Sequence, residues 1–237
     1  MPSAKRKLQI KEPKASRFDF DMVADSYDNW YASRRGAMYD RLEKELIGSL
    51  LPAGVEGEKL LEVGCGTGHW SRFFSKYGFE VTGIDISERM IDAALQKDIP
   101  NVSFYVGDGH LLPFADDSFD LTAAITTLEF VRDTDAVLRE MIRCTRKGGR
   151  ILVGVLNRLS KVNRQRQASA KGPYVNARLF SPIELKKFLE PHGQVEINVG
   201  GFIHAQSWLI PFAPWFDCIA RMFGNQKGAF IAAVLKL

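Results

Sequence analysis

The sequence predicts an α/β protein built on a mostly parallel β-sheet with helices on both faces. Three observations favour this class. Short apolar runs alternate with segments of helical periodicity between residues 59 and 156, glycines crowd 64–68 after the first run, and aspartates follow later runs. A strand, a helix and the next parallel strand form a right-handed crossover, and repeated crossovers cover the sheet on both sides. Ligands of such sheets bind beyond the carboxyl ends of the strands.

The first strand and its glycine turn occupy residues 59–70. Leu60, Leu61 and Val63 form a short apolar run, three glycines follow at alternate positions, and a helical pattern begins near Trp70. Because glycine has no Cβ, a ligand can approach the backbone of this turn, and the helix leaves its first N–H groups free beside it. We therefore expect a ligand at residues 64–68.

The second strand, at 79–86, carries an acid near its end. Asp85 follows Gly64 by 85 − 64 = 21 residues, close to the ~20-residue interval at which a mononucleotide-binding unit places an acid on ribose hydroxyls. Ser87 is a predicted cap for a helix that ends near residue 97. The later predicted elements are strands at 102–106, 119–125 and 150–156, a turn with Asp108, and a helix at 133–145.

The segments that flank this unit are less regular. Residues 37–51 have helical periodicity, and before them Tyr27, Trp30 and Tyr31 are either packing aromatics or a flap over the ligand site. After the fifth strand we expect a basic, irregular segment at 157–178, a helix capped by Ser181, strands at 195–199 and 228–235, and an aromatic stretch at 208–216 that is either core cover or a substrate wall.

Composition bounds the class of protein. A chain of 237 residues with 46% hydrophobic content can bury a full core. The net charge of +4 is concentrated in the first seventeen residues and in 157–178, which indicates a disordered basic tail or, alternatively, a nucleic-acid or acidic partner. Three widely spaced cysteines favour a reducing compartment. With no apolar run long enough for a signal peptide or a membrane span, a cytoplasmic protein is expected.

Four ordered motifs carry a family resemblance. They are Leu-Glu-Val-Gly-Cys-Gly-Thr-Gly at 61–68, Gly-Ile-Asp-Ile-Ser at 83–87, Gly-Asp-Gly at 107–109 with Leu-Pro-Phe-Ala-Asp-Asp-Ser-Phe-Asp at 112–120, and Arg-Lys-Gly-Gly-Arg at 146–150. Together they resemble the class I S-adenosylmethionine-dependent methyltransferases, most closely the subgroup that methylates small molecules and quinone rings. The resemblance covers residues 18–156 well and the remainder in outline.

The resemblance implies a Rossmann-like, seven-stranded, mostly parallel sheet whose last strand is antiparallel and lies between the fifth strand and the 195–199 strand. It implies one methyltransferase domain at 18–237 after a disordered basic tail at 1–17, with an N-terminal helical lid at 18–52 and substrate-covering insertions at 157–180 and 202–224. The implied cofactor is S-adenosyl-L-methionine and the product S-adenosyl-L-homocysteine. The implied cofactor-binding residues are Glu62, Gly64, Cys65, Gly66, Thr67, Gly68, Asp85, Ile86, Met90, Asp108, Gly109 and Ile125.

The resemblance also assigns roles. Glu62 would order the loop near the ammonium group, Asp85 would bind the ribose, and Asp108 with the Gly109 backbone would meet the adenine edge. The alternative for each acid is a helix cap or a turn residue. A dinucleotide fingerprint has two residues between its last glycines, whereas one residue separates each pair of glycines at 64, 66 and 68. The resemblance therefore implies a cofactor without a phosphate.

Methyl transfer from a sulfonium is an in-line displacement that depends on alignment, and a base helps only where the acceptor loses a proton. Candidate bases are Tyr27, Tyr31, His69 and Glu129. The histidines form no close pair in the sequence, so no metal site is expected. The leading hypothesis is methylation of O, N or C of a small molecule. The alternatives are a nucleic-acid or protein methyltransferase and a non-catalytic S-adenosylmethionine-binding protein.

Overall fold

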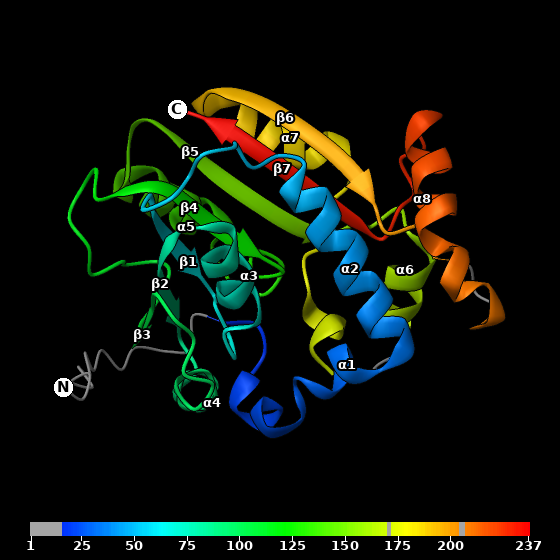
Figure 1. The fold of residues 1–237 in the computed structure, drawn as a ribbon, viewed down its shortest axis with the longest axis horizontal. Helices are drawn as coiled ribbons and strands as arrows, with labels where there is room; N and C mark the ends of the chain where they lie inside the picture. Colours follow the sequence, from blue (N-terminus) through cyan, green and yellow to red (C-terminus); the bar gives the residue numbers. More distant parts are fainter. Residues whose placement is uncertain (1–15, 170–171, 204–206) are drawn as a thin grey trace.

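A computed structural model describes residues 16–169, 172–203 and 207–237 (Figure 1). These residues form one seven-stranded sheet in the order β3-β2-β1-β4-β5-β7-β6. Strands from β3 to β5 pair in parallel, and β7 is antiparallel to both β5 and β6. The predicted sheet is confirmed, including the place of its last strand. The strands are β1 Lys59–Val63, β2 Glu80–Asp85, β3 Val102–Val106, β4 Phe119–Ile125, β5 Thr145–Leu156, β6 Gln194–Gly200 and β7 Phe230–Lys236.

Side-chain caps mark the start of α2, α4, α5 and α7. The hydroxyl of Ser87 accepts from the amide of Met90, and the carboxylate of Asp133 accepts from that of Ala136. Ser181 forms a capping box with Glu184, as its sequence position predicted. The α-helices are α1 Asn29–Ala32, α2 Arg34–Gly48, α3 His69–Tyr77, α4 Glu88–Leu95, α5 Thr134–Cys144, α6 Lys161–Ala168, α7 Pro182–Leu189 and α8 Ala213–Met222, and short 3₁₀ turns are η1 Phe20–Met22, η2 Ala24–Ser26, η3 Pro173–Asn176, η4 Glu190–His192 and η5 Ser207–Phe212.

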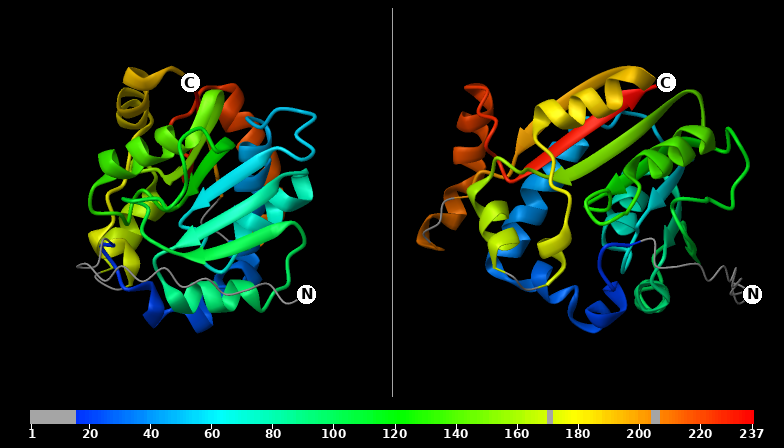
Figure 2. Two further views of the ribbon diagram at one scale, coloured as in Figure 1. Left: turned by 90° about the vertical axis from the view of Figure 1, so that its left-hand side faces the viewer. Right: turned by 180° about the vertical axis from the view of Figure 1, so that it is seen from behind.

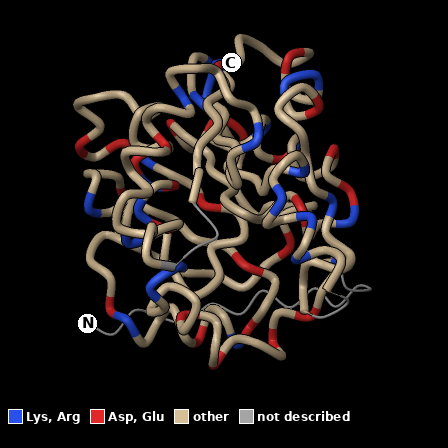
Figure 3. The backbone as a smooth tube through the Cα atoms, turned by 90° about the vertical axis from the view of Figure 1, so that its right-hand side faces the viewer, with Lys and Arg blue, Asp and Glu red and all other residues tan. Residues whose placement is uncertain are grey.

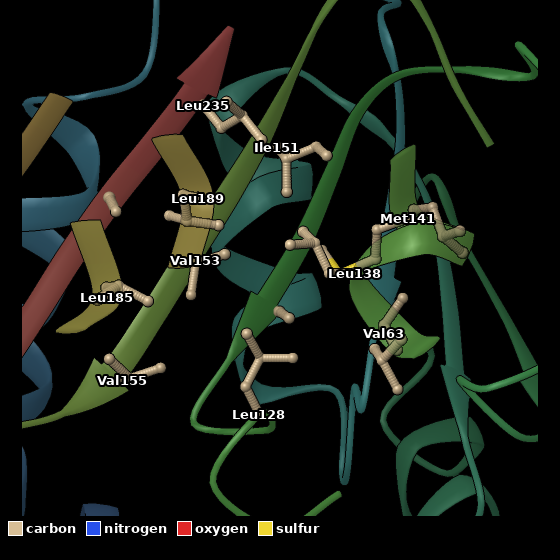
Figure 4. Packing of buried hydrophobic residues seen from close by; sticks show 14 of the residues in the cluster. Val63, Leu128, Leu138, Met141, Ile151, Val153, Val155, Leu185, Leu189 and Leu235 are labelled. Carbon is tan, nitrogen blue, oxygen red and sulfur yellow. The ribbon is translucent and has the colours of Figure 1, made fainter. Parts of the chain in front are cut away.

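Helices cover both faces of the twisted sheet, as the two further views show (Figure 2). Neighbouring residues of a strand point to opposite faces, and Val153 of β5 accordingly packs in one core while Leu152 packs in the other. Leu138 of α5 and Leu189 of α7 pack in the first core together with Val153 (Figure 4). On the second face α2 and α3 contribute buried side chains, among them Phe74.

The segment before α2 crosses one end of the sheet. The predicted tail at 1–17 lies mostly outside the described residues, but its last two members are described and paired. Ser16 forms a bridge with Val131, and the amide of Arg17 donates to the carbonyl of Phe130 over 2.6 Å. From there η1 and η2 contact α4. This part of the chain therefore lies beside the carboxyl ends of the central strands.

The segment predicted to be irregular, 157–178, contains a helix, and the aromatic stretch, for which no helix was predicted, is helical too. The segment 157–178 contains α6 and η3, and the aromatic stretch forms η5 and α8. The sequence of α6 has no apolar stripe because its buried residue is a polar one, Asn163. The side-chain amide of Asn163 donates to the backbone carbonyls of Asn157 and Ala229 over 3.0 and 2.7 Å. Tertiary hydrogen bonds therefore position this helix, and periodicity does not reveal it.

The fifth strand starts earlier than predicted, at Thr145. Thr145 pairs with Phe119 and Arg150 pairs with Leu121, so the residues between them bulge from the ladder.

Charges of both signs are interspersed along much of the chain (Figure 3). Among the described helices, none has the length and apolar character needed to cross a membrane.

Candidate functional site

A cleft opens at the carboxyl ends of β1, β2 and β4, where the sequence predicts the ligand. Its empty volume is ≈ 670 Å³, which includes space open to solvent. Its walls come from the glycine turn, the loops after β2, β3 and β4, and the segment before α1. The lining residues are Ser16, Phe20, Tyr27, Val63, Gly64, Gly66, Ile84, Asp85, Ile86, Met90, Gly107, Asp108, Gly109, His110, Ile125, Thr126, Thr127, Phe130 and Val131.

The glycine turn needs glycine for two different reasons. At Gly64 the backbone has φ +74°, and an added Cβ would lie 2.3 Å from the Cγ2 atom of Thr127. At Gly66, with φ +51°, an added Cβ would meet no atom within 4 Å. Because Gly66 lines the cleft, its missing side chain leaves room for a ligand beside the backbone.

Asp85 is held by the turn that it faces. One carboxylate oxygen accepts from the amide of Gly66 over 2.8 Å and the other accepts from the amide of Ser87 over 2.9 Å. Burial raises the pKa of Asp85, and these amide hydrogen bonds partly oppose that rise. Each oxygen keeps a lone pair for a further donor. Asp85 can therefore accept from both hydroxyls of a vicinal diol.

The loop after β3 contributes a histidine that sequence reasoning missed. The amide of His110 donates to Asp108 over 2.9 Å, and the Nδ1 atom of its ring lies 2.6 Å from the same carboxylate oxygen. The amide of Asp133 donates to Nε2 over 3.2 Å. Since Nε2 accepts, Nδ1 carries the proton and donates to Asp108. The predicted adenine-binding acid is thus oriented by a neighbouring ring.

The end of β4 carries backbone strain at the cleft. Thr126 has φ +49°, which is rare for a β-branched residue, and its amide donates to the carbonyl of Gly154 over 2.7 Å. Such conformations cost on the order of 1–3 kcal/mol and persist where surrounding contacts impose them. The sequence contains no indication of this strain, because any residue type can follow a strand.

Four of the predicted cofactor residues lie off the cleft wall. Glu62 is fully buried and accepts from the hydroxyl of Ser71 over 2.5 Å, which ties β1 to α3. Burial raises the pKa of Glu62 to about 8. Thr67 donates to a carboxylate oxygen of Asp28 over 2.7 Å. The cleft is lined by Gly64, Gly66, Asp85, Ile86, Met90, Asp108, Gly109 and Ile125 of the predicted set, and not by Glu62, Cys65, Thr67 or Gly68.

Aromatic side chains from distant segments close one side of the cleft. Phe20 and Phe130 meet edge to face with their ring centroids 5.1 Å apart, and both line the cleft together with Tyr27. Sequence reasoning identified Tyr27 and missed the other two. An aromatic cluster before α2 was visible in the sequence, but its contact with the loop after β4 was not.

The four candidate bases separate in the structure. Tyr27 lines the cleft. The ring centroid of Tyr31 lies 6.1 Å from that of Tyr27. Tyr31 stacks on His69 at 3.6 Å, and the Nε2 atom of His69 lies 2.7 Å from a carboxylate oxygen of Asp40. His69 therefore joins α2 to α3 through Asp40. Neither Tyr31 nor His69 lines the cleft.

Glu129 is the candidate with an unpartnered oxygen. It is fully buried, and its Oε1 atom accepts from the amide of Leu156 over 2.6 Å. Its Oε2 atom has no hydrogen-bond partner among the described residues. Burial raises the pKa of Glu129 to about 7, in the range suited to proton transfer near neutral pH. Its neighbour Phe130 lines the cleft.

Behind Glu129 lies a mixed aromatic and charged cluster. The guanidinium of Arg166 lies over the rings of Trp30, Tyr39 and Tyr174 at 4.8, 5.6 and 5.4 Å. Burial raises the pKa of Glu43 to about 8, and the charge of Arg166 opposes that rise. The cluster joins α1 and α2 to α6 and η3. Among the described residues, no group of three or more His, Cys, Asp or Glu side chains is placed to bind a metal ion.

The buried carboxyl of Glu129 leads to a pH-dependent prediction. The pKa of Glu129 is about 7 in the folded chain and 4.5 without the fold, so the folded chain holds this proton more tightly. The resulting stabilisation is fully present below pH 4.5 and is lost as the pH rises through about 7. We expect Glu129→Gln to raise the free energy of unfolding at about pH 8 by on the order of 1–3 kcal/mol and to change it little at about pH 5. Urea denaturation at both pH values measures this.

The exposed Glu196 provides the control. Glu196→Gln removes the same charge and should give no comparable difference between the two pH values. A Glu129→Gln chain that follows the parent at both pH values would contradict the assignment of a buried, unpaired carboxyl.

Comparison with known proteins agrees with this geometry. Residues 61–153 match the family model described as a methyltransferase domain. An uncharacterised protein of Methanocaldococcus jannaschii is 29% identical over 216 residues, which cover 90% of this chain and 96% of that protein. The demethylmenaquinone methyltransferase of Renibacterium salmoninarum is 32% identical over 146 residues, which cover 60% of this chain and 59% of that enzyme. The chain thus spans less than two thirds of that named enzyme.

A solved structure extends the similarity to almost the whole fold. It is an S-adenosylmethionine-dependent methyltransferase of Thermotoga maritima, described as a possible histamine N-methyltransferase. It superposes with a TM-score of 0.71 at 25% identity and covers 92% of this chain and 97% of that chain. With the strand order, the glycine turn and the four sequence motifs, these similarities show that the chain carries a methyltransferase domain and has the class I S-adenosylmethionine-dependent methyltransferase fold.

Proposed function

We propose that this protein transfers a methyl group from S-adenosyl-L-methionine to a small-molecule acceptor. The observation that carries the proposal is the pairing of Gly66 and Asp85 in one cleft. The amide of Gly66 fixes the carboxylate of Asp85, and the missing side chain of Gly66 leaves space beside it. A nucleoside fits this arrangement because it offers a diol to the acid and a flat ring to the apolar wall.

The residues present suit such a cofactor at each of its parts. Asp85 would accept from the ribose hydroxyls, and Ile86 and Met90 would pack on the adenine. Asp108, oriented by His110, would accept from the exocyclic amine. The cofactor supplies an activated methyl group when bound. The glycine turn contributes close backbone approach for its amino-acid end.

The aromatic side of the cleft would receive the acceptor. Phe20, Tyr27 and Phe130 line it with rings, which exclude water and align a flat or apolar molecule for in-line transfer. For an acceptor that loses a proton, Glu129 is the proposed base, reached after movement of the lid because the side chain is buried. The relative named demethylmenaquinone methyltransferase supports a small-molecule acceptor over nucleic acid or protein.

Calorimetry with the purified chain tests the proposal. We expect S-adenosyl-L-methionine and S-adenosyl-L-homocysteine to bind at one site, and NAD to give no heat. Release of S-adenosyl-L-homocysteine in the presence of small aromatic alcohols, amines and quinols then identifies the acceptor class. Binding of NAD in place of the adenosyl compounds would contradict the proposal. Binding without turnover on every acceptor class would favour the non-catalytic alternative.

A further inference from the structure

An apolar stripe stands out of the protein along η5 and α8. Its side chains are Trp208, Phe212, Trp215, Met222 and Phe223, with exposed fractions of 67%, 55%, 62%, 79% and 85%. Trp215 and Met222 are separated by seven residues along α8, which is the spacing of one helical face, and Trp208 and Phe212 precede them on η5. Side chains at this spacing normally turn into a core, but here they face solvent.

The opposite side of α8 explains why the stripe faces outward. Ala213 and Asp217 are buried beneath the helix. A carboxylate oxygen of Asp217 accepts from the amides of Gly201 and Phe202 over 2.7 and 3.0 Å. These contacts anchor α8 to the end of β6 by its polar side. The aromatic stretch is therefore only in part core cover, and its largest side chains project from a fixed helix.

Basic side chains lie on the segment that carries the stripe and on a segment that adjoins it. The segment 207–228 contains one acid, the buried Asp217, together with Arg221 and Lys227, both exposed. The Nη1 atom of Arg221 lies 3.8 Å from a carboxylate oxygen of Asp217, so this cation is in part compensated, whereas Lys227 has no ion pair among those that the structure shows. The segment 158–169 contains no acid, and it exposes Lys161 and Arg164 on α6. The side-chain amide of Asn157, before α6, donates to the backbone carbonyl of Gln226, after α8, over 2.8 Å, so the two segments adjoin. Figure 3 looks onto the side of the molecule that carries α8.

We propose that this docking face, defined as the stripe with Lys161, Arg164, Arg221 and Lys227, binds the surface of an anionic lipid bilayer. A helix with Trp, Phe and Met on one side and cations beside them suits the boundary between headgroups and acyl chains. Anionic headgroups attract the cations, and no exposed acid in either segment opposes them.

Charge and shape favour a bilayer over other occupants. Pairing with a second copy through the same face would set Arg221 and Lys227 against the cations of that copy, which is unfavourable. The stripe lies on a convex helix, whereas a protein partner needs complementary packing around each large side chain. A fluid bilayer accepts projecting rings without such a match.

Helix α6 exposes Lys161 and Arg164 of the docking face and also carries Arg166, which lies against Trp30 and Tyr174. A bound bilayer would therefore adjoin the lid side of the acceptor region. The docking face itself does not depend on methyl transfer, so its test is separate from that of the proposed function.

Flotation of the full chain with vesicles tests the proposal. We expect binding to phosphatidylcholine vesicles that contain phosphatidylglycerol, weak binding to phosphatidylcholine alone, and loss of binding as salt is added. Trp215→Ala with Phe223→Ala should weaken partitioning about tenfold or more. Arg221→Gln with Lys227→Gln should weaken it about fivefold for each charge removed. A blue shift of tryptophan emission on binding reports burial of Trp208 and Trp215.

Matched variants control for surface apolarity and net charge. Met22→Ala with Ile183→Ala removes two exposed apolar side chains elsewhere, and Lys76→Gln with Lys147→Gln removes two charges elsewhere. Both should bind as the parent does, and circular dichroism checks that every variant is folded. Failure of the parent to float with the anionic vesicles, or undiminished binding by the Trp215 and Phe223 pair, would overturn the proposal. So would a dimer in solution that this pair abolishes.

Discussion

Replacing Gly66 with valine should abolish binding of S-adenosyl-L-methionine while leaving the chain folded. The added Cβ would enter the cleft, since no protein atom lies within 4 Å of its position. The two γ-methyl groups would then fill the space proposed for the cofactor. We expect Kd to rise on the order of a hundredfold or more, which corresponds to roughly 3 kcal/mol. Calorimetry with S-adenosyl-L-homocysteine measures this.

Gly148 provides a matched control for backbone strain. It has φ +73° and, like Gly66, no atom within 4 Å of an added Cβ, but it lies in the bulge of β5 away from the cleft. Gly148→Val therefore imposes a similar left-handed conformation on a β-branched residue without entering the cleft. Equal loss of binding in both variants would mean that the effect is one of folding, and unaltered binding in Gly66→Val would remove the cleft assignment.

Replacing Asp85 with alanine should weaken cofactor binding by about 1–3 kcal/mol, because the hydrogen bonds to a diol are lost. The amides of Gly66 and Ser87 also lose their acceptor, so part of the effect reflects a loosened turn. An analogue of S-adenosyl-L-homocysteine that lacks the ribose hydroxyls separates the two contributions. Asp85→Ala should weaken binding of the parent ligand more than binding of this analogue.

Asp85→Asn refines the same test, since it keeps one carbonyl oxygen for a backbone amide. We expect its affinity to lie between those of the parent and the alanine variant. Equal losses for the two ligands in Asp85→Ala would show that Asp85 only orders the turn, as a helix-entry residue does.

The strands from β1 to β4 and the helices between them could be predicted because short-range sequence patterns determine them. Each strand from β1 to β4 is a short apolar run with a turn after it, and the position of Asp85 follows from its interval after Gly64. Ser87, Asp133 and Ser181 cap helices in the way their residue types favour. Local preference and tertiary contacts agree at these positions, so the sequence suffices.

Other features depend on contacts between distant segments. Phe20 and Phe130 are separated by 110 residues in the chain and meet only in the fold. Helix α6 is polar on nearly every side and is positioned by Asn163, so its periodicity gives no warning. Glu62 stands in the predicted motif, yet its side chain turns toward Ser71 and not into the cleft. Motif position alone does not fix the direction of a side chain.

The place of β7 between β5 and β6 has a consequence for local unfolding. Among the described strands, β6 pairs with β7 alone, whereas β5 keeps β4 as a second neighbour. Detachment of β7 would therefore release β6 together with α8, whose Asp217 contacts Gly201. The pairing of the strands from β3 to β5 would stay intact. Such subglobal opening is typical of cooperative units within one domain. The β6–β7 edge with α8 can thus open as one unit, while the strands whose ends form the cleft keep their pairing.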